Sequence, residues 1–554
     1  MAENVLNPGV WQQQLASNPG FAVRSRSHNP LDSYPSSRNA PTSMQPTYDV
    51  AVIGGAIAGA SAGFLLKRRH PNLRVLIIEK STEFDRKVGE STSEVSASFL
   101  SRVLNLAQHL GHEQLTKSGL RFWFYRAEVD AFERCGEIGP SFQTRLPTFQ
   151  LDRARLDQVV LEQALKQGCE LWRPAKIQDL ELAGENQNRL TVRCGNEVRT
   201  VVARWVIDAS GRAAAVARKL RLFQPLKAHP TNAVWARFKN VADFDGLDLW
   251  DEQPDFATSC RVMRQWATNH LMGYGWWCWI IPLKGGDFSV GLVYDSRIYE
   301  LPPGPTLADR LKAHLLLHPL GRRLFANAQH VENDVRAYSQ LSFYSEQTMG
   351  DGWILAGDAA GFLDPLYSPG LDMVAFTVSA AVELVGDALT GKDVTARRTE
   401  YNRSYQEQFH TWFESVYRDK YYYMGDAELM TIAFLFDVAT YFMGPVRQVY
   451  GRCPKRYTVF PYTGPIGGAV GRFMRFYNRR LATLAKRRVA AGTYGQKNLD
   501  RRLLLPGFSP DASSFKFVRL GLRKWLYAEW SNLFLRFPSE AGALLREATT
   551  AAGP

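Results

Sequence analysis

The chain has 554 residues, of which 45% are hydrophobic and 22% charged, the ordinary mix of a soluble globular protein with two or three structural units. No uninterrupted apolar run reaches the roughly 18 residues of a membrane span, and we see no secretory signal near the N-terminus. Six cysteines without regular spacing indicate reduced thiols. We therefore expect a cytoplasmic protein and no metal site.

The net charge of +13 is concentrated in one segment. Between Arg452 and Lys524, seventeen basic residues stand against two acidic ones, Asp500 and Asp511, which gives this segment a charge of +15. Such a field favours an acidic protein partner or an anionic membrane surface. A solvated helical face is the alternative interpretation, and we expect no nucleic-acid partner.

The N-terminal part predicts a tail followed by a βαβ unit. Residues 1–46 are rich in Asn, Gln, Ser and Pro and are predicted to be disordered. Residues 48–53 and 74–79 are predicted strands, joined by a glycine-rich turn and an apolar helix that runs through residue 66. The next predicted elements are a helix at 155–167 and strands at 177–182, 190–193 and 205–208.

The rest of the chain predicts a second sheet and then helices. Residues 230–345 are mainly predicted strands, and residues 353–356 form a further buried strand. A long apolar helix is predicted over residues 372–389, with Gly391 as its stop. Beyond it the chain is predicted to be helical, aromatic and, later, basic.

The glycine-rich turn has the pattern of a dinucleotide site. It runs from Gly54 to Gly59 and matches GxGxxG, except that Ala56 replaces the second glycine. Such a turn lets the backbone approach a pyrophosphate that lies at a helix N-terminus. Glu79 ends the second strand, where a carboxylate can accept hydrogen bonds from both ribose hydroxyls. The turn alone is a weak signal, and Glu79 strengthens it.

Two further strands end in acidic turns. One leads into Asp208, and the other leads into Gly357 and Asp358. In a flavin site the second aspartate can bind a ribityl hydroxyl, while the next helix points its positive end at the ring. Each turn alone is an ordinary strand exit. The three segments in this order, together with Glu79, indicate an FAD site.

Over roughly residues 47–390 the chain resembles FAD-dependent monooxygenases of the p-hydroxybenzoate hydroxylase type, and within them the flavin-dependent halogenases. Residues 149–157 (FQLDRARLD) are similar to the segment whose arginine, here Arg153, lies near the cofactor. Residues 88–92 (VGEST), which include Glu90, are similar to the halogenase flavin strap.

The resemblance implies an α/β (α+β) fold: a Rossmann-like FAD-binding domain with an inserted, mainly β substrate sheet and a helical C-terminal region. The expected parts are the disordered tail at 1–46, the FAD-binding domain at 47–229 with its return segment at 346–391, the β-sheet substrate region at 230–345, and the helical, aromatic and basic region at 392–554.

The most specific match is residues 277–282 (WCWIIP), which fit the WxWxIP motif of the halogenases. Trp277 and Trp279 alternate along a strand, so their indoles should share one face of the sheet. The resemblance implies that this wall keeps substrate away from the flavin and lets only a small oxidised halide pass. Outside the flavin context, the segment would be an ordinary Trp-rich buried strand.

Lys117 precedes an aromatic strand and is similar in position to the halogenase catalytic lysine. In a dry site its ammonium could hydrogen-bond to hypohalous acid, or its amine could form a chloramine if the pKa is depressed enough. Without the resemblance, a lysine before a strand is usually a surface residue.

Residues 362–370 (FLDPLYSPG) resemble the halogenase loop that passes the flavin and holds chloride with backbone amides near its end. Pro369 has no N–H to offer an anion, whereas Gly370 and Leu371 can still donate. Tyr367 occupies the place of the substrate-binding glutamate of tryptophan halogenases, so free tryptophan is not the expected substrate.

The resemblance implies a halogenase that receives reduced FAD from a separate NADH- or NADPH-dependent flavin reductase, and we find no second dinucleotide motif after residue 212. Dioxygen and halide would give hypohalous acid for an electron-rich phenol- or pyrrole-like ring in secondary metabolism, either free or tethered to an acyl or peptidyl carrier protein. The alternative is a halogenase-fold monooxygenase or dehydrogenase without halide use, with Pro369 as its mark. A third hypothesis is a flavoprotein kept for binding, whose basic region docks a carrier protein or a membrane.

Overall fold

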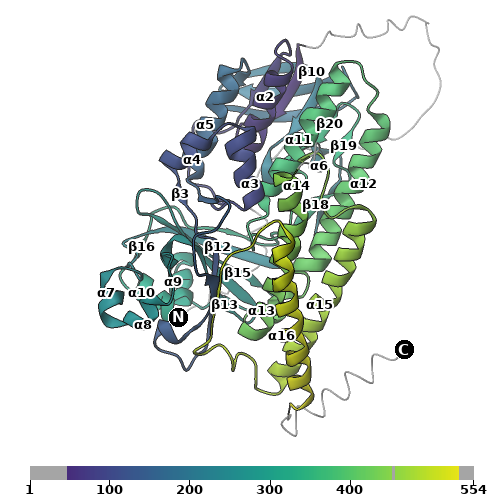
Figure 1. The fold of residues 1–554 in the computed structure, drawn as a ribbon. Helices are drawn as coiled ribbons and strands as arrows, with labels where there is room; N and C mark the ends of the chain where they lie inside the picture. The colour runs from purple at the N-terminus through teal and green to yellow at the C-terminus, as the bar shows by residue number, and fades with distance from the viewer. Residues whose placement is uncertain (1–46, 452–455, 536–554) are drawn as a thin grey trace, which may run out of the picture. The chain divides into compact units, whose positions relative to one another are not determined.

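The computed structural model describes residues 47–451 and 456–535 (Figure 1). The tail predicted at residues 1–46 lies outside the described residues, as does Cys453. The other five cysteines are free thiols. The fold is mixed α/β, as the sequence predicts.

The first sheet has a parallel core of five strands, in the order β20-β10-β1-β2-β7. Their bounds are Trp353–Leu355, Glu197–Asp208, Tyr48–Ile53, Val75–Ile78 and Glu170–Trp172. Ile53 pairs with both Asp208 and Ile78, so three of these strands end at the same edge of the sheet. This edge carries the predicted dinucleotide turn.

Three helices associated with this sheet lie together: α2 contacts both α5 and α11 (Figure 1). Their bounds are Ile57–Arg69 for α2, Arg153–Lys166 for α5 and Gly370–Leu389 for α11. Helix α5 begins two residues earlier than predicted because the carboxylate of Asp152 caps it, accepting hydrogen bonds from Ala154 N and Arg155 N.

The second sheet has nine strands and gathers them from a wider stretch of chain than residues 230–345. Six strands come from that region: β12 (Thr231–Lys239), β13 (Thr268–Gly273), β14 (Trp276–Pro282), β15 (Phe288–Asp295), β16 (Gln329–His330) and β17 (Arg336–Tyr338). Three come from elsewhere: β4 (Leu120–Phe124), β5 (Gly136–Pro140) and β22 (Arg502–Leu505). The region itself also contains helices α7 (Leu247–Glu252), α8 (Pro254–Thr258), α9 (Leu307–Leu317) and α10 (Pro319–Phe325).

Strand β14 is buried on both faces. Trp277 and Trp279 belong to the main hydrophobic core, whereas Trp276 and Cys278 belong to a second core cluster. The two alternating indoles of the WxWxIP motif therefore lie on the same face, with ring centroids 6.0 Å apart.

The C-terminal part is helical apart from β22. It contains α12 (Thr395–Trp412), α13 (Ala427–Tyr441), α14 (Arg447–Tyr450), α15 (Gly464–Ala490) and α16 (Phe515–Leu533). By length and composition, the continuous helical stretch Ala427–Tyr450 could cross a membrane, with a mean hydropathy of 1.6 in its most apolar window, although Glu428 and Asp437 interrupt its apolar run. Of that window, 72% is buried within the protein, which is typical of a core helix.

Several basic residues of α15 form ion pairs with acidic residues that lie outside the basic segment 452–524. Arg488 is 5% exposed and contacts Asp426 and Glu428, while Arg480 pairs with Glu529. Helix α16 differs, because apolar side chains at helical spacing face solvent along its length. Its exposed stripe consists of Phe515, Leu522, Leu526, Trp530 and Leu533. Exposed Lys516, Arg519 and Arg523 lie on or beside this stripe.

Candidate functional site

The dinucleotide turn is fixed by close packing at the sheet edge. Gly54 has a φ of +98°, and a Cβ on it would lie 2.6 Å from the carbonyl oxygen of Ala209, just beyond β10. Gly59, in the first turn of α2, lies directly against the carbonyl of Gly54 and also leaves no room for a side chain. The turn therefore needs both glycines for the fold itself.

Glu79 holds the turn from the neighbouring strand. Its Oε2 accepts a hydrogen bond from Gly55 N at 2.7 Å, and its Oε1 accepts from the backbone N and the hydroxyl of Ser81. Burial opposes ionisation of this carboxyl, but the hydrogen bonds from Ser81 and Gly55 outweigh it and lower the pKa of Glu79. The side chain is therefore an anion at neutral pH.

The N-terminus of α2 is suited to a pyrophosphate. Ala56 is its N-cap, no side chain caps the helix, and the first turn contains no acidic residue. Unpaired N–H groups at such a terminus bind anions. Together with the glycine cradle and the Glu79 carboxylate, this arrangement fits an FAD.

The strap segment is anchored by ion pairs. Glu90 Oε1 lies 2.6 Å from Arg237 Nη2 of β12, so Glu90 ties the strap to the second sheet. Arg153 binds Asp157 through two nitrogens and also donates to the carbonyls of Val88 and Gly89. Both predicted residues thus position the strap with their side chains.

The second flavin segment borders a small cavity of about 380 Å³, including space open to solvent. Gly357 N donates to Thr377 Oγ1 at 2.8 Å, and the half-buried Asp358 lines the cavity. Gly370 and Pro369 line it from the start of α11, which no side chain caps. The N–H groups of Gly370 and Leu371 therefore lie in an uncapped first helical turn, which also contains the carboxyl group of Asp372.

Lys117 lies at the wall of a second, larger cavity of about 1070 Å³, including its opening. The lysine is 2% exposed, and its Nζ donates to Ser91 Oγ at 2.8 Å and to the carbonyl of Thr92 at 2.7 Å. Burial lowers the pKa of Lys117 to about 8, although nearby Glu94 and Asp372 act in the opposite direction. At neutral pH the group is therefore mostly an ammonium.

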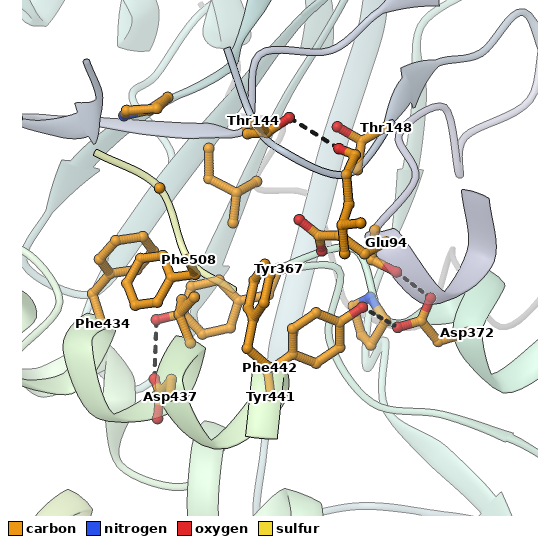
Figure 2. Close-up of a pocket in the computed structure, with 18 of the residues that line it drawn as sticks. Glu94, Thr144, Thr148, Tyr367, Asp372, Phe434, Asp437, Tyr441, Phe442 and Phe508 are labelled. Carbon is orange, nitrogen blue, oxygen red and sulfur yellow. Dashed lines mark hydrogen bonds between the residues drawn. The ribbon is translucent and has the colours of Figure 1, made fainter. Parts of the chain in front are cut away.

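Two carboxyl groups line this cavity beside Lys117. Asp372, in the first turn of α11, accepts hydrogen bonds from Ser93 Oγ, from Ser96 N at 3.0 Å and from Tyr441 OH at 3.2 Å (Figure 2). Burial raises the pKa of Asp372 to about 6 against these hydrogen bonds. Glu94 is the first residue of the short helix α3 (Glu94–Ser98).

Tyr367 lines the same cavity, in the left-handed region with a φ of +71°. Its hydroxyl donates to Asp437 Oδ2 at 3.0 Å, and Lys420 Nζ lies 2.6 Å from the same oxygen. The predicted substrate-pocket residue therefore has a fixed orientation, and the ammonium of Lys420 balances the charge of Asp437.

The two cavities share part of their lining, and Pro369 and Trp412 belong to both. Trp277 and Trp279 are not among the lining residues of either cavity. The indole N–H of Trp277 donates to Tyr421 OH, which in turn donates to Asp364 of the loop before α11. Trp277 thus contacts the loop before α11 through the hydroxyl of Tyr421.

Sequence reasoning missed four cavity residues: Glu94, Asp372, Trp412 and Tyr441. Glu94 follows the recognised strap by two positions, and this proximity is the only signal that could have drawn attention to it. Asp372, Trp412 and Tyr441 lie on helices α11, α12 and α13, whose sequences predict only ordinary packing faces.

Comparison with known proteins gives one consistent result. A family model described as tryptophan halogenase matches residues 140–419. The flavin-dependent halogenase chlA of Dictyostelium discoideum is 26% identical over 71% of this chain and 69% of its own length. A 1H-pyrrole-2-carbonyl (peptidyl-carrier protein) chlorinase of Pseudomonas fluorescens is 25% identical over 67% of this chain and 82% of its own length.

Among solved structures, the halogenase PltM in complex with phloroglucinol and FAD superposes with a TM-score of 0.68. The match covers 88% of this chain and 99% of that one, at 18% sequence identity. This likeness shows a shared fold.

Proposed function

This chain belongs to the tryptophan halogenase family, and we propose that it oxidises a halide to hypohalous acid and halogenates an electron-rich aromatic compound of secondary metabolism. When bound, reduced FAD would supply the two electrons that activate dioxygen, and dioxygen is the oxidant of the halide. The first turn of α2, Glu79 and Asp358 are the groups that would hold the cofactor.

The observation that carries the proposal is Lys117. Two of the three N–H bonds of its ammonium are used by Ser91 and Thr92, and no other described group accepts from it. The third N–H is available to hydrogen-bond to hypohalous acid at the cavity wall. Of the two possibilities for this lysine, an ammonium that donates is therefore favoured over a neutral amine that forms a chloramine.

Pro369 has no backbone N–H, so halide binding requires hydrogen-bond donors from other residues. Pro369 is the N-cap of α11, and Gly370 and Leu371 follow it in the uncapped first turn. We propose that their two N–H groups bind the halide, which is compatible with a proline before them. The competing hypothesis, a monooxygenase or dehydrogenase without halide use, predicts that bromide has no effect on the product.

A single reaction tests the proposal: photoreduced FAD, dioxygen and bromide with a panel of phenols, analysed by mass spectrometry. Brominated product that depends on both bromide and the protein is the expected result. A hydroxylated or dehydrogenated product, unchanged by bromide, would instead support the competing hypothesis.

We further propose that a separate flavin reductase supplies the reduced FAD. The purified protein should therefore oxidise NADH or NADPH only after a reductase is added. Rapid oxidation of either nucleotide by the protein alone, measured at 340 nm, would contradict this partner assignment.

For the basic segment we propose contact with an anionic membrane surface through the α16 stripe. A row of large, solvent-exposed apolar side chains flanked by Arg and Lys is typical of an interfacial helix. A second copy of the same positively charged face would be repelled. Docking of an acidic carrier protein bearing the substrate is the alternative, since one relative's name specifies a carrier-bound pyrrole.

A further inference from the structure

The larger cavity has two chemically different ends. Phe434 and Phe508 lie at one end, Glu94 and Asp372 lie at the other, and Tyr367 lies between them (Figure 2). Asp437 also lies at the end of Phe434, but its oxygens already accept hydrogen bonds from Tyr367, Lys420 and Tyr477 (Figure 2). The site therefore favours a ligand with an apolar body and one polar end.

The two carboxyl groups at the polar end differ in what they can still bind. Both oxygens of Asp372 already accept hydrogen bonds, from Ser93 and Ser96 on one side and from Tyr441 on the other. Apart from its own backbone N–H, no group among the described residues donates to the Glu94 carboxylate. Glu94 is thus the acceptor left for a ligand.

The charged and titratable groups around Glu94 come from several elements. They are Lys117 beside β3 (Leu115–Thr116), Asp372 of α11, Tyr441 of α13 and Tyr450 of α14. The exposed Arg145 lines the same cavity. Burial and the charge of Asp372 raise the pKa of Glu94 to about 7, while the Lys117 ammonium opposes them. A carboxyl titrating in this range can both take and return a proton near neutral pH.

Resting on the proposed function, we propose that Glu94 binds the hydroxyl of a phenol with an extended apolar body, and that halogenation occurs at the ring carbon next to this hydroxyl. Lys117 lies beside Glu94 at the same end of the cavity, so hypohalous acid held there is adjacent to the bound hydroxyl. Glu94 is then a catalytic residue, whereas Asp372 is a positioning residue that ties α11 to α3.

The phenol O–H proton passes to the Glu94 carboxylate, and the neighbouring ring carbon forms a bond to the halogen. The O–halogen bond breaks, and the departing oxygen keeps the electron pair and takes a proton from the Lys117 ammonium to leave as water. The amine then removes the ring C–H proton. The ring electrons return to the oxygen, which recovers its proton from Glu94.

The test compares Glu94→Gln with a matched surface control, Glu128→Gln, on two probes. Glu128 is exposed, with 71% side-chain exposure, so it receives the same chemical change outside the cavity. The probes are 4-hydroxybiphenyl and 4-methoxybiphenyl, which share a body and differ in the ionisable proton. We expect the wild type and Glu128→Gln to brominate the phenol beside its hydroxyl. Glu94→Gln should do so roughly 100-fold more slowly and react with the ether at an unchanged low rate.

The pH profile gives a readout that a purely structural role would not change. In the wild type, bromination should rise with pH as Glu94 ionises around pH 7 and fall as Lys117 loses its proton around pH 8. Glu94→Gln should lose the acidic limb. Because the Glu94 charge raises the pKa of Lys117, its removal should move the alkaline limb to lower pH.

A bromide-dependent oxidation assay with monochlorodimedone separates the possible failures. If no trap is brominated, the proposed function itself fails. If the trap reacts but phenol and ether react alike, if Glu94→Gln keeps the wild-type profile, or if neither biphenyl reacts, the assignment of Glu94 and of the substrate class is overturned.

Discussion

The dinucleotide turn and the Lys117 cavity are built in opposite ways. The turn is a local construction, in which Gly54, Gly59 and Glu79 fit together within one βαβ unit by close contact. The residues that line the cavity are spread along the chain from Thr92 to Phe508. Its reactive groups are polar side chains, such as Lys117, that keep hydrogen-bonding capacity for a ligand. Local steric demands leave a motif in the sequence, whereas a cavity assembled from distant segments does not.

The largest expected effect falls on the cavity. Lys117→Ala should lower substrate halogenation by roughly 100-fold or more, because it removes the buried ammonium that donates to Ser91 and Thr92 at the cavity wall. Binding of FAD and flavin reoxidation should stay unchanged, since Lys117 lies apart from the α2 turn. Product yield by mass spectrometry and FAD titration measure the two effects, and retained product would contradict the catalytic role.

A change in the turn should act through the fold and through the cofactor together. Gly54→Val places a branched side chain against the Ala209 carbonyl at a positive φ, so unfolding free energy should fall by about 2 kcal/mol and bound FAD should be lost. Gly111→Val is the matched control, because no heavy atom lies within 4 Å of a Cβ at that position. Thermal unfolding and the flavin absorbance report both quantities. A fully yellow, stable Gly54→Val protein would refute the assignment of this turn.

Glu79→Ala should have a smaller effect than Gly54→Val, because it removes hydrogen bonds but forces no added side chain into the turn. We expect FAD to bind about tenfold more weakly, which corresponds to roughly 1.4 kcal/mol. Exposed Glu83 gives the control, Glu83→Ala, on the same loop. Equal FAD affinities of the two variants in a fluorescence titration would remove Glu79 from the cofactor site.

These contrasts explain how far the sequence alone could go. The strand at residues 48–53 was predicted to the residue because its apolar run ends at a glycine turn. Helix α11 begins at Gly370, two residues before the prediction, because Pro369 already has helical dihedral angles. Strand β22 pairs with β5 across more than 360 residues, and no local pattern reports such a contact. Glu94 was missed for the same reason, since its role depends on Lys117 and Asp372 from two other elements.

The exposed stripe of α16 belongs to neither the turn nor the cavity, and we expect substitutions in it to have the smallest effect on activity. The stripe is an exposed apolar surface, so the test must change hydrophobicity without breaking ion pairs. Reversal of Arg488 would be unsuitable because this residue is buried between Asp426 and Glu428. Leu526→Glu and Trp530→Glu change side chains that are 71% and 57% exposed, and Tyr338→Glu on β17 introduces the same charge on another surface.

We expect the wild type and Tyr338→Glu to bind vesicles of phosphatidylglycerol and phosphatidylcholine in flotation assays. Each α16 variant should bind roughly tenfold less, because an inserted apolar side chain contributes about 1.5 kcal/mol or more. Binding should weaken as salt rises, since exposed charges are screened over about 10 Å at 0.1 M. Activity on a free phenol should be the same in all four proteins. Vesicle binding that is absent at low salt would refute the membrane proposal, and loss of activity only with carrier-bound substrate would support the carrier alternative.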